Sequence, residues 1–164
     1  MQKRILLALF TCFSFLCAGA QNTEKIERAY AFYKVTMPGI MPVDENGQPR
    51  EMPANIERFI YIECRGTQMP RVTEVLYNNT AFTATITGLK DGRILVGKKA
   101  ENGQDVQLLA KKGNRFWMIS LQPANNKPQP PQGSKQVIIK SRIGSKPYKF
   151  YLYKETQLET LPSY

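Results

Sequence analysis

The sequence predicts an all-β fold, a single antiparallel β-sandwich of about nine short strands behind a cleaved signal peptide. Three observations favour it. Runs rich in Val, Ile, Thr, Tyr and Phe recur along the chain, and each is bounded by Gly, Pro or Asn. Helical periodicity is nearly absent along the chain. The best helix candidate, residues 24–33, continues into β-branched residues, which favour a strand instead. A short apolar segment ending in small residues precedes all of this.

The N-terminus has the order of a secretory signal peptide. Lys3 and Arg4 precede an apolar run over residues 5–16, which is shorter than the about 20 residues that a membrane-spanning helix needs. Small residues follow the run, so we expect cleavage between Ala20 and Gln21. The mature protein would then be exported, either periplasmic or secreted, with no integral membrane span.

Cleavage divides the chain into a signal peptide, residues 1–20, and a single β-sandwich domain, residues 21–164. An uncleaved membrane anchor is the alternative interpretation of the first segment. Lipoprotein anchoring is not expected, because Cys17 follows Leu16 rather than a small residue.

The mature chain would carry 21 basic and 13 acidic side chains, a net charge of +8, which attracts anionic partners. The chain contains no histidine, so it lacks the commonest general base and the commonest zinc ligand. We expect no cofactor, no metal site and no catalytic residue. After cleavage Cys64 is the remaining cysteine, and its place on the apolar side of a strand with Ile60 and Ile62 predicts a buried, inert thiol.

The expected strands follow one another with turn signals between them, which is typical of an Ig-like or related sandwich. Asn78 and Asn79 mark one such turn, and residues 44–47 mark another. Two segments rich in proline and polar residues, 38–54 and 123–135, should be mobile loops. The strands are placed near residues 26–37, 56–65, 72–77, 80–87, 93–99, 105–111, 115–121, 136–143 and 148–154.

The middle of the chain predicts a three-stranded meander. Residues 102–103 and 113–114 both have the composition of two-residue hairpin turns. Pairing outward from these turns places Gly97 opposite Leu108 and Leu108 opposite Ile119. Both hairpins then put the same residues of the shared strand on one face.

The last two strands predict a hairpin with two different faces. With an even-length turn at residues 144–147, a core face gathers Val137, Ile139, Ser141, Ile143, Tyr148, Phe150 and Leu152. The opposite face gathers Lys140, Arg142, Lys149, Tyr151 and Tyr153. The ordinary interpretation of that face is a solvated surface whose lysine stems cover the rings. The functional interpretation is a ligand-binding face, since cations neutralise phosphate or carboxylate while tyrosine rings stack on sugars or bases.

No motif in the chain names an activity. We expect an exported, non-catalytic binding or accessory protein of the bacterial cell envelope that engages an envelope protein partner. The alternative is a binding protein for an anionic polymer or glycan that uses the basic, tyrosine-containing face; specific nucleic-acid binding is not expected. A carboxylate-based hydrolase is a second alternative, although no two carboxylates sit in a setting that predicts separated pKa values.

The signal-peptide interpretation has a direct test. The intact mass of the natively expressed protein should correspond to a chain that begins at Gln21, because the cleavage site follows Ala20. Mass spectrometry that finds residues 1–20 still attached, or a lipid on Cys17, would contradict the expected compartment.

Overall fold

The computed structural model describes residues 25–36, 43–48, 55–124 and 136–160. Over these residues the chain is all-β and forms no α-helix, as the sequence predicts. Nine strands lie where they are expected, and a tenth, β10, is additional. The strands are β1 (Lys25–Thr36), β2 (Asn55–Arg65), β3 (Arg71–Tyr77), β4 (Thr80–Gly88), β5 (Arg93–Lys98), β6 (Asp105–Leu109), β7 (Asn114–Pro123), β8 (Val137–Ile143), β9 (Lys146–Leu152) and β10 (Glu155–Leu158).

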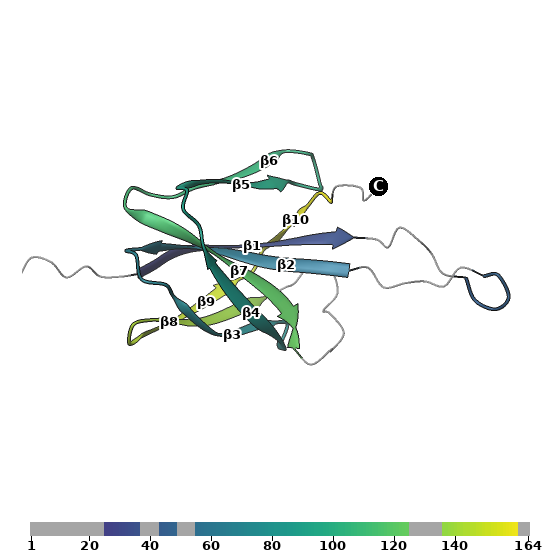
Figure 1. Ribbon diagram of the computed structural model, residues 1–164, viewed down its shortest axis with the longest axis horizontal. Helices are drawn as coiled ribbons and strands as arrows, with labels where there is room; N and C mark the ends of the chain where they lie inside the picture. The colour runs from purple at the N-terminus through teal and green to yellow at the C-terminus, as the bar shows by residue number, and fades with distance from the viewer. Residues whose placement is uncertain (1–24, 37–42, 49–54, 125–135, 161–164) are drawn as a thin grey trace, which may run out of the picture.

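Eight strands form one curled sheet with the order β10-β1-β2-β7-β4-β3-β8-β9, and β5 and β6 form a separate two-stranded sheet. Figure 1 shows the β5–β6 hairpin on one side of β1, β2 and β10, with β3, β8 and β9 on the other side. The Ig-like arrangement of two facing sheets is therefore not confirmed, because the eight strands belong to one sheet that bends round on itself.

Some sequence expectations fall outside the described residues. These are the signal peptide, its cleavage between Ala20 and Gln21, and most of the segments 38–54 and 123–135. Within the first of these segments a turn is confirmed, because Asp44 Oδ1 accepts hydrogen bonds from the backbone N–H groups of Asn46 and Gln48 at 2.9 and 2.8 Å.

A short connection forces the sheet to curl. β9 and β10 lie at opposite edges of the sheet, yet only Tyr153 and Lys154 separate them. In a flat sheet seven strand spacings of about 4.8 Å would hold these edges about 34 Å apart, whereas the chain from Leu152 to Glu155 reaches at most about 11 Å. The sheet therefore bends until β9 lies beside β1. β10 then pairs in parallel with β1 over residues 31–34.

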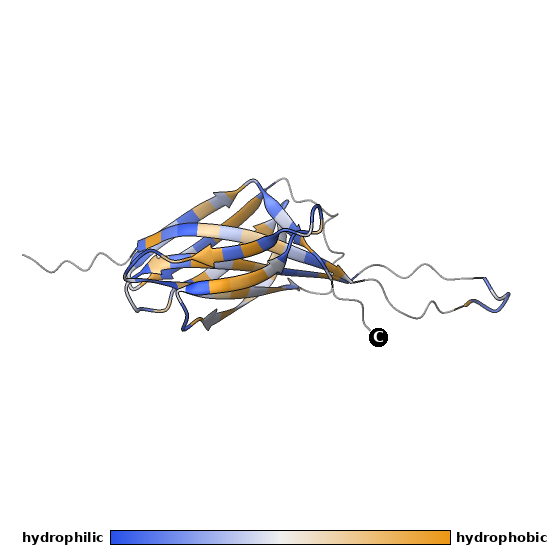
Figure 2. Ribbon diagram, turned by 90° about the horizontal axis from the view of Figure 1, so that it is seen from above, coloured by the Kyte–Doolittle hydropathy of each residue, from blue (hydrophilic) through white to orange (hydrophobic). Residues whose placement is uncertain are grey.

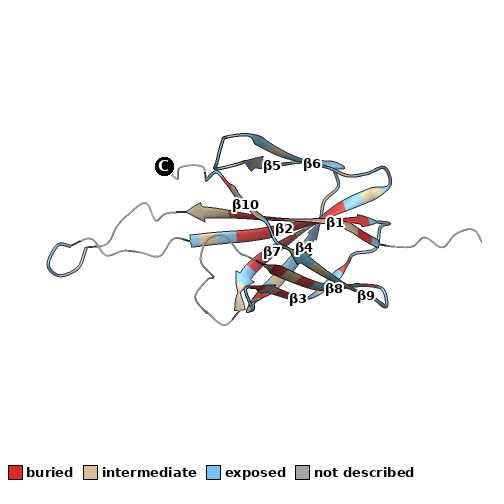
Figure 3. Cartoon of the chain, turned by 180° about the vertical axis from the view of Figure 1, so that it is seen from behind, coloured by how far each residue is buried: buried red, intermediate tan, exposed pale blue. Residues whose placement is uncertain are grey.

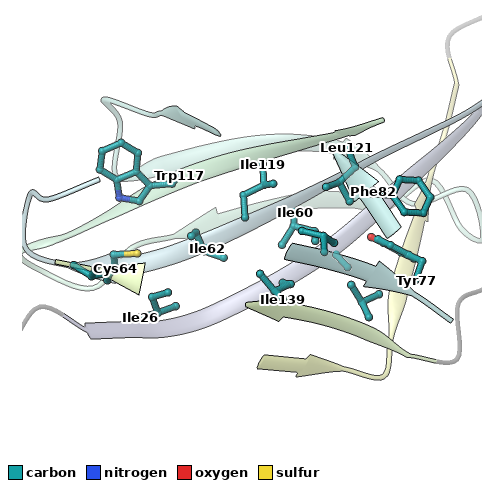
Figure 4. Packing of buried hydrophobic residues seen from close by; sticks show 14 residues of the cluster. Ile26, Ile60, Ile62, Cys64, Tyr77, Phe82, Trp117, Ile119, Leu121 and Ile139 are labelled. Atoms are coloured by element: carbon teal, nitrogen blue, oxygen red, sulfur yellow. The ribbon is translucent and has the colours of Figure 1, made fainter. Parts of the chain in front are cut away.

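The inner face of the curl holds the main hydrophobic core. Side chains alternate across each strand, so every second residue points inward, and Figure 2 shows the resulting alternation of hydropathy along the strands. Figure 4 shows side chains from opposite walls meeting inside the curl. Cys64 is fully buried among them, as the sequence predicts. The buried core residues are Ile26, Ala31, Ile60, Ile62, Cys64, Val75, Tyr77, Phe82, Trp117, Ile119, Leu121, Val137, Ile139 and Ile143.

One ion pair is buried inside the curl. The Nε of Arg58 on β2 lies 3.4 Å from Oε1 of Glu155 on β10, and both side chains are at most 1% exposed. The guanidinium also lies over the rings of Tyr33, Tyr77 and Phe82, with its carbon 5.1 to 6.0 Å from their centroids. The pair therefore joins the edge strand β10 to the centre of the sheet.

The β5–β6 hairpin covers the outer face of the sheet and creates a second apolar layer. Figure 3 shows that the hairpin itself is largely exposed or intermediate, whereas β1, β2 and β7 beneath it contain buried stretches. Two backbone hydrogen bonds tie its end to β10: Ala100 N–H donates to Gln157 O, and Glu159 N–H donates to Lys98 O. The buried residues of this layer are Phe32, Phe59, Tyr61, Leu108, Phe116 and Leu158.

The predicted meander is wrong in its second half. β7 pairs with β2 and β4, and no pairing joins it to β6 within the described residues. Leu108 therefore lies over the outer face of the sheet with Phe116, instead of beside Ile119. The predicted register of the first half is also wrong. Gly97 lies opposite Val106, because the turn spans residues 100–103. A bulge between Leu95 and Gly97 then shifts the register once more and places Leu95 opposite Gln107.

Removing the charge of Arg58 should destabilise the fold strongly. Arg58→Leu would leave the Glu155 carboxylate buried without its cation, which costs about 3–5 kcal/mol of unfolding free energy. Urea denaturation followed by circular dichroism measures this loss. The double variant Arg58→Leu/Glu155→Leu is the control, and it should recover most of the stability. A single variant as stable as the parent would contradict a structural role for the pair.

Candidate ligand-binding face

Four of the five residues of the predicted ligand-binding face lie on the outer side of β8 and β9, and the fifth, Tyr153, directly follows β9. The inward residues of this hairpin are those that the sequence predicts, and all five outward residues are exposed. The turn is shorter than expected: Ile143 pairs with Lys146, which leaves Gly144 and Ser145 as its two residues. An even length is kept, so the faces do not change. We call Lys140, Arg142, Lys149, Tyr151 and Tyr153 the basic tyrosine face.

Cations of the basic tyrosine face lie directly opposite one another. Lys140 is the cross-strand partner of Lys149. Arg142 is the cross-strand partner of Arg71, on the neighbouring strand β3. Like charges in such positions are destabilising. Glu74 offsets part of this repulsion, because it forms an ion pair with Lys140. Together with Arg71 and Glu74 of β3, the basic tyrosine face therefore presents four cations and one carboxylate across three adjacent strands, and an anionic ligand would neutralise the excess positive charge.

The tyrosines of this face border a hollow where the curl closes. Its volume is about 330 Å³, and it lies between β1 and the chain segment that leads from β9 to β10. Tyr151 and Tyr153 are 44% and 70% exposed, and Tyr30 of β1 completes the aromatic part of the wall. The Lys149 Nζ lies 4.9 Å from the centroid of the Tyr151 ring, so a cation already borders the hollow's aromatic wall.

Two other hollows offer less to a ligand. One of 530 Å³ lies at the end of β2 and β7, but its aromatic residues, Phe59 and Tyr61, are more than nine-tenths buried under the hairpin. Another of 430 Å³ is lined by Glu101 and Glu155. The Glu155 side chain is 1% exposed and lies against Arg58. Glu101 is exposed, so its carboxylate offsets the charge of Lys99 and Lys154 in this hollow and makes it less suited to an anion.

The second buried carboxylate, Glu63, attaches the β6–β7 connection to the outer face of the sheet. Glu63 accepts hydrogen bonds from the Arg28 side chain, from the backbone N–H of Lys111 at 2.9 Å and from Asn114 Nδ2 at 2.6 Å. Arg28 also donates to the carbonyl oxygen of Leu109 at 2.9 Å. Burial alone would raise the pKa of Glu63, but the hydrogen bonds from Arg28, Lys111 and Asn114 lower it below 4.5, the ordinary value.

The two buried glutamates do not share a site. Glu63 lies on the outer face of β2, whereas Glu155 lies inside the curl beside Arg58. Each faces an arginine, so the carboxylate-based hydrolase has no shared carboxylate site at these two positions.

Sequence reasoning misses two residues of this surface. Arg71 directly follows Pro70 at the start of β3, and no local signal indicates that β3 pairs with β8, far along the chain. Tyr30 belongs to a strand that the sequence predicts, but only the closing of the curl brings that strand beside β9.

Comparison with protein-family models, with curated proteins and with solved structures gives no match. In the described part of the chain, no group of three or more His, Cys, Asp or Glu residues could hold a metal ion. None of the described residues belongs to a helix long and apolar enough to cross a membrane.

Acid should weaken the attachment made by Glu63. Its folded-state pKa lies below its unfolded-state value, so its contribution to stability is present above about pH 4.5 and is lost as the pH falls through the folded-state pKa. Glu63→Gln should lower the unfolding free energy at neutral pH by about 1.5–3 kcal/mol, because hydrogen bonds to a charged group are lost. The difference between parent and variant should shrink in acid. Denaturation curves over a pH series measure this, and a constant difference would contradict it.

Proposed function

We propose that this chain is an exported, non-catalytic binding protein of the bacterial cell envelope, and that its basic tyrosine face holds an anionic polymer or glycan. The observation that carries the proposal is the placement of cations directly opposite one another, Lys140 with Lys149 and Arg71 with Arg142. A fold keeps such pairs at a cost in stability. A bound polyanion would remove the repulsion between the paired cations. Each contact between a cation and the polymer would also release counterions from the polymer, which favours binding.

The scaffold suits this function. The curled sheet encloses one apolar core, and the hairpin covers a second apolar layer on its outer face. The basic tyrosine face lies on β8 and β9, away from the face that the hairpin covers. Rigid strands therefore present its cations without requiring a loop to become ordered.

An envelope protein partner is the second candidate. Leu95 and Leu109 are 64% and 63% exposed, and their strands pair in the β5–β6 hairpin. Two exposed leucines on a small hairpin favour contact with another apolar surface. This interaction would depend little on salt, whereas polyanion binding weakens steeply as the salt concentration rises.

The test compares two triple variants with equal charge loss. Lys140→Gln/Arg142→Gln/Lys149→Gln should fold normally, because exposed charges matter by less than about 0.5 kcal/mol each. Its affinity for heparin and for polyphosphate should fall. The slope of log affinity against log salt should decrease by about two to three, since each lost phosphate contact contributes slightly less than one.

The control variant is Lys90→Gln/Lys98→Gln/Lys112→Gln, which removes three exposed cations elsewhere. It should keep most of the affinity. An equal loss in both variants would show that only total charge is being measured, and it would overturn the proposed site. The second candidate would be favoured by two results together. The first triple variant would keep its affinity for the polyanions, and the parent would bind an envelope protein that Leu95→Ala/Leu109→Ala no longer binds.

A further inference from the structure

The hollow beside the basic tyrosine face arises from how the curl closes. β1 pairs with β10 over residues 31–34, and β9 pairs with β8. β9 also lies beside β1, but among the described residues no backbone pairing joins these two strands. The sheet thus has a seam, and the hollow of about 330 Å³ lies along it.

The lining of the hollow along the seam includes two alanines and three tyrosines. Ala29 and Ala31 leave space between the strands, while Tyr30, Tyr151 and Tyr153 supply ring surface and phenolic hydroxyl groups. A tyrosine offers an apolar body with a hydrogen-bonding end. A sugar ring has the matching properties, because one side of it carries C–H groups and its rim carries hydroxyl groups.

Cations flank these rings. The Lys149 Nζ lies 4.9 Å from the centroid of the Tyr151 ring. The guanidinium carbon of Arg28 lies 5.9 Å from the centroid of the Tyr30 ring, but Glu63 neutralises its charge. Lys154 also lines the hollow. A carboxylate or sulfate on the same sugar would therefore meet a positive charge within reach of the ring.

We infer that the hollow is a subsite for one ring of an acidic polysaccharide, whose neighbouring residues lie over the cations of β8 and β9. This inference rests on the proposed function and specifies its ligand. The volume is near the lower end of the about 300–1,000 Å³ of small-ligand sites, which suits one ring. A single strand of nucleic acid fits less well, because successive bases need several open ring faces, and Lys149 covers one face of Tyr151.

Three probes separate the contributions. Polygalacturonate has charged sugar rings, polyphosphate has charge without rings, and single-stranded DNA has charge with stacking bases. Tyr151→Ala/Tyr153→Ala should lower the affinity for polygalacturonate by at least about fivefold, the low end of what one ring stacked on an aromatic side chain contributes. The affinity for polyphosphate should not change, because no cation is removed.

The matched control is Leu95→Ala/Leu109→Ala, which removes comparably exposed apolar side chains from the hairpin. It should bind all three probes like the parent. Tyr153→Ala alone is the milder variant if the double variant unfolds, because this side chain is 70% exposed. Its expected effect is a smaller loss, again for polygalacturonate alone.

The outcomes distinguish the inference from the proposed function. A tyrosine variant that loses polygalacturonate and polyphosphate equally, or loses neither, overturns the sugar subsite while the basic tyrosine face stands. A larger loss for DNA than for polygalacturonate also overturns it, in favour of a base-stacking site. If the parent binds none of the three probes, the proposed function itself fails.

Discussion

The architecture of this protein depends on a two-residue connection. Tyr153 and Lys154 join strands that lie at opposite edges of an eight-stranded sheet, and such a connection exists only if the sheet bends round until its edges meet. The bend creates an enclosed inner face, so apolar side chains from all parts of the sheet can pack together there. It also gives β10 access to the interior, where Glu155 meets Arg58.

Two buried glutamates organise the two layers of the molecule. Glu155 lies inside the curl and Glu63 lies outside it, and an arginine neutralises each. A buried charge is costly unless it is paired and hydrogen-bonded, so each pair favours one arrangement of the strands that carry it. Glu155 holds the closing strand to β2. Glu63 holds the β6–β7 connection, and with it the hairpin, against the outer face. Excess positive charge is left at the surface, where Lys140 and Lys149 lie opposite each other and Glu74 neutralises part of their charge.

Local features of this fold are readable from the sequence, and distant pairings are not. The β8–β9 hairpin and both of its faces are predicted from alternation and a turn, as is the turn at residues 78–79, where both asparagines have positive φ. β7 is predicted at the right residues but with the wrong partner, because the turn signal before it indicates a hairpin with β6. Phe116 and Trp117 are both buried on opposite faces, which is the pattern of a central strand, and such a strand takes partners on both edges. β10 is short and polar, so only its place beside β1 makes it a strand.

The closing of the curl has a consequence for the order of folding. Tyr33 donates a hydrogen bond to Gln157 across 124 positions of sequence, and the whole β1–β10 pairing is of this range. Contacts so far apart in sequence form slowly, because a long loop must close before they contribute. While the chain leaves the ribosome, β1 keeps an unpaired edge until residue 158 has emerged. An unpaired edge is a template for pairing with another chain, so this protein is most exposed to aggregation just before its last described strand arrives.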